Sequence, residues 1–298
     1  MTTLLVTGAS GKFGLRVLHH LLETLQIAPE RIIATTRKPA TLSAFAQRGV
    51  RVRAADFDEP ASLPLAFAGA DRLLIISTDA IGQPGRRLEQ HERAIAAAEQ
   101  AGVQHLLYTS CPEPEGSPLH IAPDHEGTEQ AIRGSKFTGW TLLRNHWYFD
   151  NLMFSLPGIA AQGGKWFTAA GEGRVASLSR DDLAYAAAVA LASPGETGKT
   201  TYTLSGDEAL STAEQAAILA RELGKAIEVV QVPVEAIVQG MVGAGFPEPV
   251  ATALASFDTN TAAGRVATVT ADFRRLTNRP PRRLADWVKT NRSMLLGN

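Results

Sequence analysis

The sequence VTGASGKFG, residues 6–14, is rich in small residues and follows directly after an apolar run. Its glycines, Gly8, Gly11 and Gly14, are spaced GxxGxxG. Glycine at the first position permits a sharp strand-to-helix turn, and at the second it lets the backbone approach a pyrophosphate. At the third it lets the helix lie close to a sheet, and the N–H groups at the start of that helix then face the anion. The stretch therefore predicts a dinucleotide-binding turn, with a glycine-rich turn that holds no ligand as the alternative.

Apolar runs alternate with helix-like segments around this turn, up to about residue 145. The runs that predict strands lie at 3–7, 31–35, 50–54, 71–77, 105–110 and 139–144. Several are continuous rather than alternating, as expected for strands that are covered on both faces. The helix-like stretches between them lie near 13–25, 39–47, 60–67, 86–101 and 124–134. Repeated βα units of this kind predict an α/β fold with a parallel, doubly wound sheet.

The pattern changes after about residue 150. A helix that ends in a glycine-rich loop is followed by a helix of small residues at 179–193 and a strand at 200–206. Ser211 and Glu214 then form a capping box at the start of a further helix. We interpret residues 1–150 as a dinucleotide-binding domain with a returning segment near 178–206. The rest of 151–298 is expected to form a smaller α/β domain that carries the substrate site.

The composition argues against several classes of partner. The formal net charge is −1 and no basic tract stands out, so electrostatics gives no reason to expect nucleic acid or an anionic membrane. No apolar run approaches the roughly 20 residues that a transmembrane helix needs, and the N-terminus lacks the pattern of a signal peptide. A single cysteine, Cys111, excludes an intrachain disulfide and a zinc site built from cysteines. A cytoplasmic protein is the simplest expectation.

The end of the second predicted strand bears on the choice of dinucleotide. An acidic residue usually stands there in proteins that select NAD, but this chain has ATTRKP, with the cations Arg37 and Lys38. Two cations suit a 2′-phosphate, and Arg37 could also stack on the adenine. The sequence thus favours NADP(H), with NAD(H) left open and a solvated basic pair as the alternative. Asp56 and Phe57 are expected to touch the adenine, and Ser77 and Thr78 end the fourth strand on the same side.

Further stretches of the sequence are similar to one protein family. They are VTGASGKFG, TTRKP, AADFDEP, LLIIS, LLYTS, TLLRNHWYFDN and LTNRPPRRLADWV. These stretches resemble the atypical short-chain dehydrogenase/reductases of the NmrA-like group, in particular type 2 NAD(P)H:quinone oxidoreductases and triphenylmethane reductases. The resemblance runs nearly end to end, and the pairing of the glycine turn with LLRNHWY is fairly specific. It implies a Rossmann domain, a small substrate domain, and NADPH lying across the carboxyl edge of the sheet.

The resemblance also implies roles for the residues after the sixth predicted strand. In the family the stretch matching 143–148 lies beside the nicotinamide, and the loop matching 169–174 borders the substrate cleft. A glycine-type residue is common where His146 stands here, so His146 departs from the pattern and is expected to narrow or polarise the cleft. The full set of predicted cofactor-binding residues is Gly8, Ala9, Ser10, Gly11, Lys12, Phe13, Gly14, Arg37, Lys38, Asp56, Phe57, Ser77, Thr78, Leu143, Asn145 and His146.

Ordinary short-chain dehydrogenases carry Tyr-x-x-x-Lys, in which the lysine lowers the tyrosine pKa for proton transfer. The motif is absent, because the residues four positions after Tyr108, Tyr148, Tyr185 and Tyr202 are Pro112, Leu152, Val189 and Gly206. This argues against alcohol oxidation and sugar epimerisation, which need a positioned base. It does not argue against hydride transfer to a quinone or a cationic dye, because such acceptors are already electron-poor. It also suits a protein that only binds the cofactor.

The candidate catalytic residues are His125, Asn145, Trp147 and Tyr148. His125 falls roughly where the missing pair would stand and could orient a carbonyl or donate a proton, or it could be a capping or surface histidine. Glu129, on the same helix face, is expected to be solvated. Asn145 to Tyr148 would fix the nicotinamide, and the aromatic side chains could wall a planar acceptor or equally belong to the core.

The leading hypothesis is an NADPH-dependent oxidoreductase that transfers hydride to a planar, electron-poor acceptor such as a quinone or a dye-like compound. Catalysis would rest mainly on proximity and orientation. We expect no flavin and no metal, and a homodimer is compatible with the sequence. The alternative is a non-catalytic, NmrA-like regulator that senses NAD(P).

Overall fold

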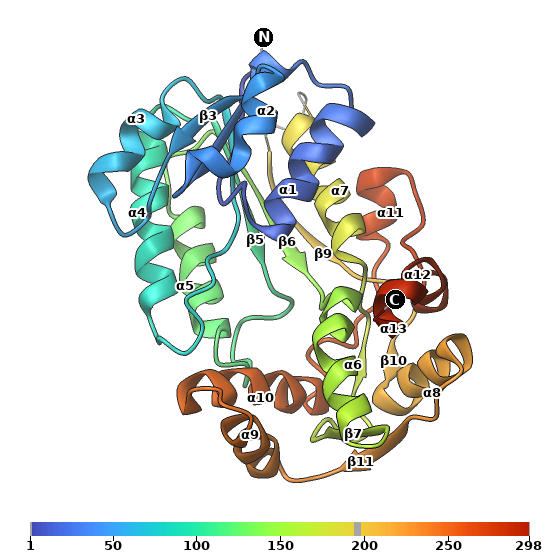
Figure 1. Ribbon diagram of the computed structural model, residues 1–298. Coiled ribbons are helices and arrows are strands. Elements are labelled where there is room, and N and C mark those ends of the chain that lie inside the picture. The colour runs from blue at the N-terminus through green and yellow to red at the C-terminus, as the bar shows by residue number, and fades with distance from the viewer. Residues whose placement is uncertain (1, 194–197, 298) are drawn as a thin grey trace.

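The computed structural model describes residues 2–193 and 198–297. Within these ranges a seven-stranded parallel sheet forms the centre of the molecule, in the order β3-β2-β1-β4-β5-β6-β9 (Figure 1). Its strands are β1 (Leu4–Val6), β2 (Ile32–Thr36), β3 (Arg51–Ala54), β4 (Arg72–Ile75), β5 (His105–Ser110), β6 (Gly139–Asn145) and β9 (Lys199–Leu204). Since β1 lies between β2 and β4, the strand order reverses at this point. The doubly wound sheet predicted from the sequence is confirmed, and its switch point is where such sheets bind ligands.

Helices cover both faces of this sheet. On one face α1 (Lys12–His19) packs beside α7 (Arg180–Ala192), which also contacts α11 (Asp272–Thr277). The other face carries α3 (Leu63–Phe67), α4 (Arg86–Gln100) and α5 (Ala122–Arg133), and the short helix α2 (Ser43–Gln47) precedes β3. The predicted helix at 13–25 is α1 continued by a π-helical turn, His20–Thr24.

Two hydrophobic cores follow from the alternation of side chains along the buried strands. Val6, Leu74, Leu107 and Leu143 belong to the core under α1 and α7. The residues beside them in sequence, such as Leu5, Leu73, Leu106 and Leu142, belong to the core under α4 and α5. Because both faces are covered, the strands are continuous apolar runs. The switch point is thereby held between two packed layers.

β9 pairs in parallel with β6 and so forms the last strand of the central sheet. The remaining elements gather beyond the carboxyl edge of the strands (Figure 1). They are β7 (Lys165–Thr168), β8 (Arg174–Val175), β10 (Leu210–Ser211), β11 (Glu228–Gln231), α6 (Leu152–Ala161), α8 (Thr212–Leu223), α9 (Val234–Gly243), α10 (Glu248–Ala262), α12 (Leu284–Thr290) and α13 (Arg292–Leu296). A division into two domains near residue 150 stays a prediction. No helix in the described ranges is long and apolar enough to cross a bilayer.

Candidate functional site

The glycine turn joins β1 to α1 in a conformation that only small residues allow. Gly8 has a φ of +57°, in the left-handed region that favours glycine. A Cβ on Gly14 would lie 2.5 Å from the carbonyl oxygen of Gly8 and 2.7 Å from the Cα of Ala9. The helix therefore packs directly on the turn. Gly11, at the N-cap of α1, has no side chain to cap the first amides, which leaves them free for an anion.

The end of β2 lies against this turn. The hydroxyl of Ser10 is hydrogen-bonded to that of Thr36, with 2.7 Å between the oxygen atoms. Thr36 Oγ1 also accepts the backbone N–H of Lys38. The side chains of Arg37 and Lys38 are exposed and form no ion pair among the described residues. Two free cations thus stand one βα unit after the glycine turn.

The ends of β3 and β4 are held by hydrogen bonds from neighbouring segments. Asp56 is partly exposed and its backbone N–H donates to Ser62, while Phe57 is buried. The backbone N–H of Ser77 donates to Thr109 Oγ1 at 2.8 Å. That of Thr78 donates to His91 Nε2 at 3.0 Å. The predicted contacts Ser77 and Thr78 are therefore fixed from the α4 and β5 side.

The stretch after β6 reaches the glycine turn. Tyr148 stacks on Phe13, with 6.3 Å between ring centroids, and the guanidinium of Arg180 lies 5.4 Å from its centroid. Burial raises the pKa of Tyr148, while the charge of Arg180 opposes the rise. Asn145 is buried beside the Tyr148 hydroxyl, whose pKa its side chain lowers, and neither its amide oxygen nor its amide nitrogen makes a well-formed hydrogen bond among the described residues. A buried amide without well-formed hydrogen bonds is available to a ligand that offers both a donor and an acceptor.

Other members of this stretch face different surroundings. Leu143 is buried in the core under α1 and α7. The ring of Trp147 lies 4.7 Å from that of Phe257 on α10. His146 is fully buried beside the backbone of Val266, and burial lowers its pKa to about 4. A neutral imidazole thus lies in the seam between β6 and the segment around residue 266.

His125 belongs to a buried polar network that we define as Arg87, His91, Tyr108 and His125. The Tyr108 hydroxyl lies 2.8 Å from His125 Nδ1, and Arg87 Nη2 lies 3.1 Å from His125 Nε2. Burial and then the Arg87 charge hold the pKa of His125 well below its ordinary value. Both ring nitrogens are therefore engaged inside the protein, and the histidine is neutral. Proton donation by His125 stays a prediction, and the hydrogen bonds of both ring nitrogens inside the protein argue against it.

Sequence reasoning did not identify the other three members of the network. Tyr108 lies 17 residues from both histidines, and Arg87 lies 38 residues from His125, so no local motif marks them. One signal was present. Arg87 and His91 share a face of α4 with Ala94 and Ala98, and all four are buried. Polar residues in line with an apolar stripe indicate a buried polar contact.

The expectation that Glu129 is solvated was wrong. Its side chain is fully buried and accepts hydrogen bonds from Ser110 Oγ at 2.7 Å and from Arg144 Nε at 2.9 Å. Arg133 is a further ion-pair partner, at 3.0 Å. A buried carboxylate requires such partners, and these three lie at the ends of β5, β6 and α5. The i+4 spacing from His125 places it on the inner face of α5, not the outer one.

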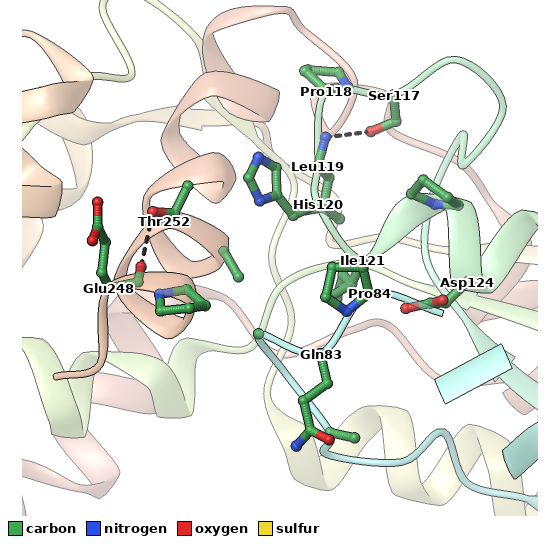
Figure 2. Close-up of a pocket in the computed structure, with 15 residues that line it drawn as sticks. Gln83, Pro84, Ser117, Pro118, Leu119, His120, Ile121, Asp124, Glu248 and Thr252 are labelled. Carbon is green, nitrogen blue, oxygen red and sulfur yellow. Dashed lines mark hydrogen bonds between the residues drawn. The ribbon is translucent and has the colours of Figure 1, made fainter. Parts of the chain in front are cut away.

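A cavity of about 570 Å³ lies beyond the carboxyl ends of β4 and β5. Figure 2 shows Glu248 and Thr252 of α10 on one side of it and Gln83, Pro84 and Asp124 on the other. His120 and Ile121 complete the wall from the segment before α5. The volume is in the range of small-molecule sites. In the described ranges no group of three or more His, Cys, Asp or Glu side chains could hold a metal ion.

Comparison with known proteins places this arrangement in a family, since the NmrA-like family matches residues 1–268. The chain belongs to the NmrA-like family. This NmrA-like protein is 35% identical over 283 residues to quinone oxidoreductase 2 of Escherichia coli, covering 95% of this chain and 96% of that one. The identity to an NAD(P)H azoreductase of Xenophilus azovorans is 29%, over 97% of each chain.

Solved structures agree with the fold of the NmrA-like protein. An Escherichia coli NADPH-dependent quinone oxidoreductase, complexed with NADPH, has a TM-score of 0.89 at 33% identity and 99% coverage of both chains. A Citrobacter triphenylmethane reductase, complexed with NADP(H), has a TM-score of 0.87 at 32% identity and covers 97% of this chain and 99% of its own.

The residues present here fit such a dinucleotide. Gly14 leaves no room for a side chain between α1 and the turn, so the amides of α1 are brought close to the site of the pyrophosphate. The amide of Asn145 has both a donor and an acceptor, which is what a carboxamide needs. Arg37 and Lys38 are free for a 2′-phosphate. The turn, the two cations and Asn145 therefore form a coherent candidate cofactor site.

Proposed function

We propose that the chain is an NADPH-dependent oxidoreductase that reduces a planar, electron-poor acceptor, with a quinone as the leading substrate class. The observation that carries the proposal is the buried Asn145 amide, which makes no well-formed hydrogen bond among the described residues and lies beside a tyrosine stacked on the glycine-turn helix. The family relatives support it, because they include a quinone oxidoreductase and an azoreductase over nearly the full chain.

In this proposal the cofactor is held mainly by backbone groups. The amides of residues 8–14 bind the pyrophosphate, and Lys12 adds a charge at the start of α1. Lys12 Nζ now lies 4.5 Å from the exposed ring of Phe154. Arg37, with Lys38, binds the 2′-phosphate, and Asp56 with Phe57 borders the adenine. Ser77 and Thr78 line the path to the nicotinamide.

The chain's own residues then orient and enclose the reacting groups. Bound NADPH supplies a hydride. Asn145 fixes the carboxamide, so that one nicotinamide face stays open, and Tyr148 and Trp147 limit access of water. Little acid–base help is required, because a reduced quinone takes its proton from water. The cavity beside α10 is the proposed approach for the acceptor, since it lies at the same edge of the sheet.

The test is oxidation of NADPH by the purified full chain with a panel of quinones and dyes, followed at the nicotinamide absorbance. We expect turnover with at least one quinone, and Asn145→Ala is expected to lower kcat/KM about tenfold, as for loss of one hydrogen-bonding group. Asn151→Ala, at an exposed position six residues on, is the matched control and should leave turnover unchanged. No oxidation with any acceptor, together with tighter binding of NADP⁺ than of NADPH, would support the sensor alternative. The cytoplasmic location and the homodimer stay predictions.

A further inference from the structure

The cavity beside α10 is joined to the stretch proposed for the nicotinamide. Leu119 lines the cavity and is buried in a small apolar cluster, against which Ile121 and Trp147 pack. Trp147 follows Asn145 by two residues, and its ring lies 4.7 Å from that of Phe257 on α10. The cavity wall and the stretch after β6 therefore belong to one packed unit. This supports the cavity as the place where an acceptor meets the cofactor.

Much of the cavity wall is rigid and apolar. Four prolines, Pro84, Pro118, Pro123 and Pro249, contribute to it from three different segments. Neither lysine nor arginine is present among the described residues that line it. Surface of this kind suits a flat, weakly polar molecule, and the few polar groups set within it decide which molecule binds.

Most polar groups of the wall already have partners or can only accept hydrogen bonds. The Ser117 hydroxyl donates to Asn260 Oδ1 at 2.6 Å, and the Thr252 hydroxyl donates to the carbonyl group of Glu248 at 2.9 Å. The carboxyl group of Asp124 accepts backbone hydrogen bonds from the start of α4. The carboxylate of Glu248 is exposed and offers acceptors only. None of these groups is a free donor for a ligand.

Two side chains of the wall do have free donors. The ring of His120 and the amide of Gln83 are exposed, and neither forms a hydrogen bond or an ion pair with the described residues. Figure 2 shows the ring of His120 directed toward Thr252 on α10, whereas the amide of Gln83 extends away from His120. His120 is thus the donor that stands between the two walls of the cavity.

The backbone of His120 is held in a fixed position. Its N–H donates to Ser256 Oγ on α10 at 3.0 Å. Ser256 is buried, and its hydroxyl donates in turn to the carbonyl group of Ala253 at 2.6 Å. The ring is therefore solvated while the chain that carries it is anchored. Such a side chain can exchange water for a ligand with little further loss of conformational entropy.

We propose that His120 is a specificity-determining residue of the acceptor site, whose ring N–H donates a hydrogen bond to an oxygen atom of the acceptor. An imidazole ring carries at least one N–H donor in either protonation state. The inference rests on the proposed function, which it deepens by naming the chemical class of the substrate. Acceptors with a carbonyl oxygen, such as quinones, gain from this contact, and planar dyes without oxygen do not.

The chemistry of reduction makes the contact stronger as the reaction proceeds. A quinone takes up one hydrogen nucleus and two electrons as hydride, while NADPH is oxidised to NADP⁺, and the product is a hydroquinone monoanion that then takes a proton from water. The negative charge develops on oxygen, so the bond from His120 is stronger in the transition state than in the bound quinone. A triphenylmethane cation takes the hydride at its central carbon, and no oxygen is present to accept from His120.

The experiment compares His120→Leu with the unaltered full chain, using menadione as the quinone and crystal violet as the acceptor without oxygen. Because the ring is exposed, the substitution removes no buried contact. We expect kcat/KM for menadione to fall about tenfold, mostly through kcat, for loss of one hydrogen bond to a developing anion. The value of kcat/KM for crystal violet should stay unchanged.

His120→Gln tests the hydrogen bond itself. Glutamine keeps an N–H donor, so this variant should retain most of the menadione turnover that His120→Leu loses. A fall as large as that in His120→Leu would overturn the inference. His19→Leu is the matched control, because His19 is also exposed but lies at the end of α1, outside the cavity wall. It should leave kcat/KM unchanged for both acceptors.

Two further results would contradict the role of His120. One is an unchanged kcat/KM for menadione in His120→Leu, and the other is an equal fall for both acceptors. If the unaltered chain does not reduce crystal violet, the dissociation constant of NADPH replaces it as the comparison. That constant should be the same in His120→Leu, and weaker NADPH binding would overturn the inference. Failure of the proposed function is seen separately, as no NADPH oxidation by the unaltered chain with any acceptor, and the inference then fails with it.

Discussion

Two regions at the carboxyl edge of the sheet handle positive charge in opposite ways. On the α1 face, Arg37 and Lys38 are exposed to solvent and available to a ligand. On the α4 and α5 face, Arg87 is desolvated whether or not a ligand is bound. An exposed cation can bind and release a phosphate without a large change in solvation, whereas a buried one exerts a strong and constant field. The comparison separates two charges that are available to a ligand from one that is held inside a buried polar network.

Acid should destabilise the buried network before it affects the glycine turn, and this is the largest effect we expect. Above pH 6.5, His91 is neutral in both folded and unfolded chains, so it contributes no pH dependence. Below that pH the unfolded chain takes up a proton that the folded one does not, because burial lowers the folded pKa to about 3. The free energy of unfolding should then fall by about 1.4 kcal/mol per pH unit for this histidine, down to about pH 3.

Urea unfolding at pH 7.5, 6.5, 5.5 and 4.5 measures this slope. The carboxylates of the chain also titrate in acid, so His91→Gln is compared over the same range. The variant should be less stable at pH 7.5 but should lose stability less steeply as the pH falls. Equal slopes for the two proteins would show that His91 is not held neutral by the fold.

The next largest effect is expected when a side chain is placed between α1 and the glycine turn. In Gly14→Ala the new Cβ would lie 2.5 Å from a backbone oxygen that cannot move without the turn. We expect a loss of about 1–3 kcal/mol in stability and a larger loss of NADPH binding, measured by thermal unfolding and fluorescence titration. Gly158→Ala in α6 is the control, because nothing lies within 4 Å of its added Cβ. An unchanged NADPH affinity in Gly14→Ala would contradict the proposal that the pyrophosphate binds at the glycine turn.

Removal of the exposed cation Arg37 should have the smallest effect. Arg37→Ala is expected to weaken NADPH binding by about 1 kcal/mol, roughly fivefold, because the pair with the 2′-phosphate is solvated. Binding of NADH should be unaffected. Arg48→Ala, which removes an exposed arginine paired with Glu23, serves as the control. If affinities for NADPH and NADH fall together, Arg37 does not recognise the 2′-phosphate.

The sequence predicted the parts of the molecule that depend on neighbouring residues. The strands of the sheet, the glycine turn and the capping box at Ser211 are all local patterns, and each lies within a few residues of its predicted position. The sequence also shows that Trp147 and Tyr148 lie in one short aromatic stretch. Their partners, Phe257 and Phe13, were not, because aromatic pairing across 110 or more residues leaves no spacing rule.

The buried polar groups show where sequence reasoning fails. Glu129 looked like a solvated helix residue because acidic side chains usually are, and its partners Ser110 and Arg144 come from two strands. Arg87 and His91 were not among the candidate site residues, although both lie on the buried face of α4. Only the packing of α4 against α5 turns that face inward. The burial of polar residues by tertiary packing could therefore not be predicted from this one sequence.

The position of β9 in the sequence, far beyond that of β6, has a consequence for folding during synthesis. The strand that covers β6 lies more than fifty residues further along, after an excursion through α6 and β7. During synthesis β6 therefore emerges from the ribosome with one side unpaired, and it stays so until residue 204 has been added. An open strand edge is a template for intermolecular pairing. Truncation between residues 150 and 198 should accordingly yield aggregates, and a chaperone that shields β6 should bind such nascent chains.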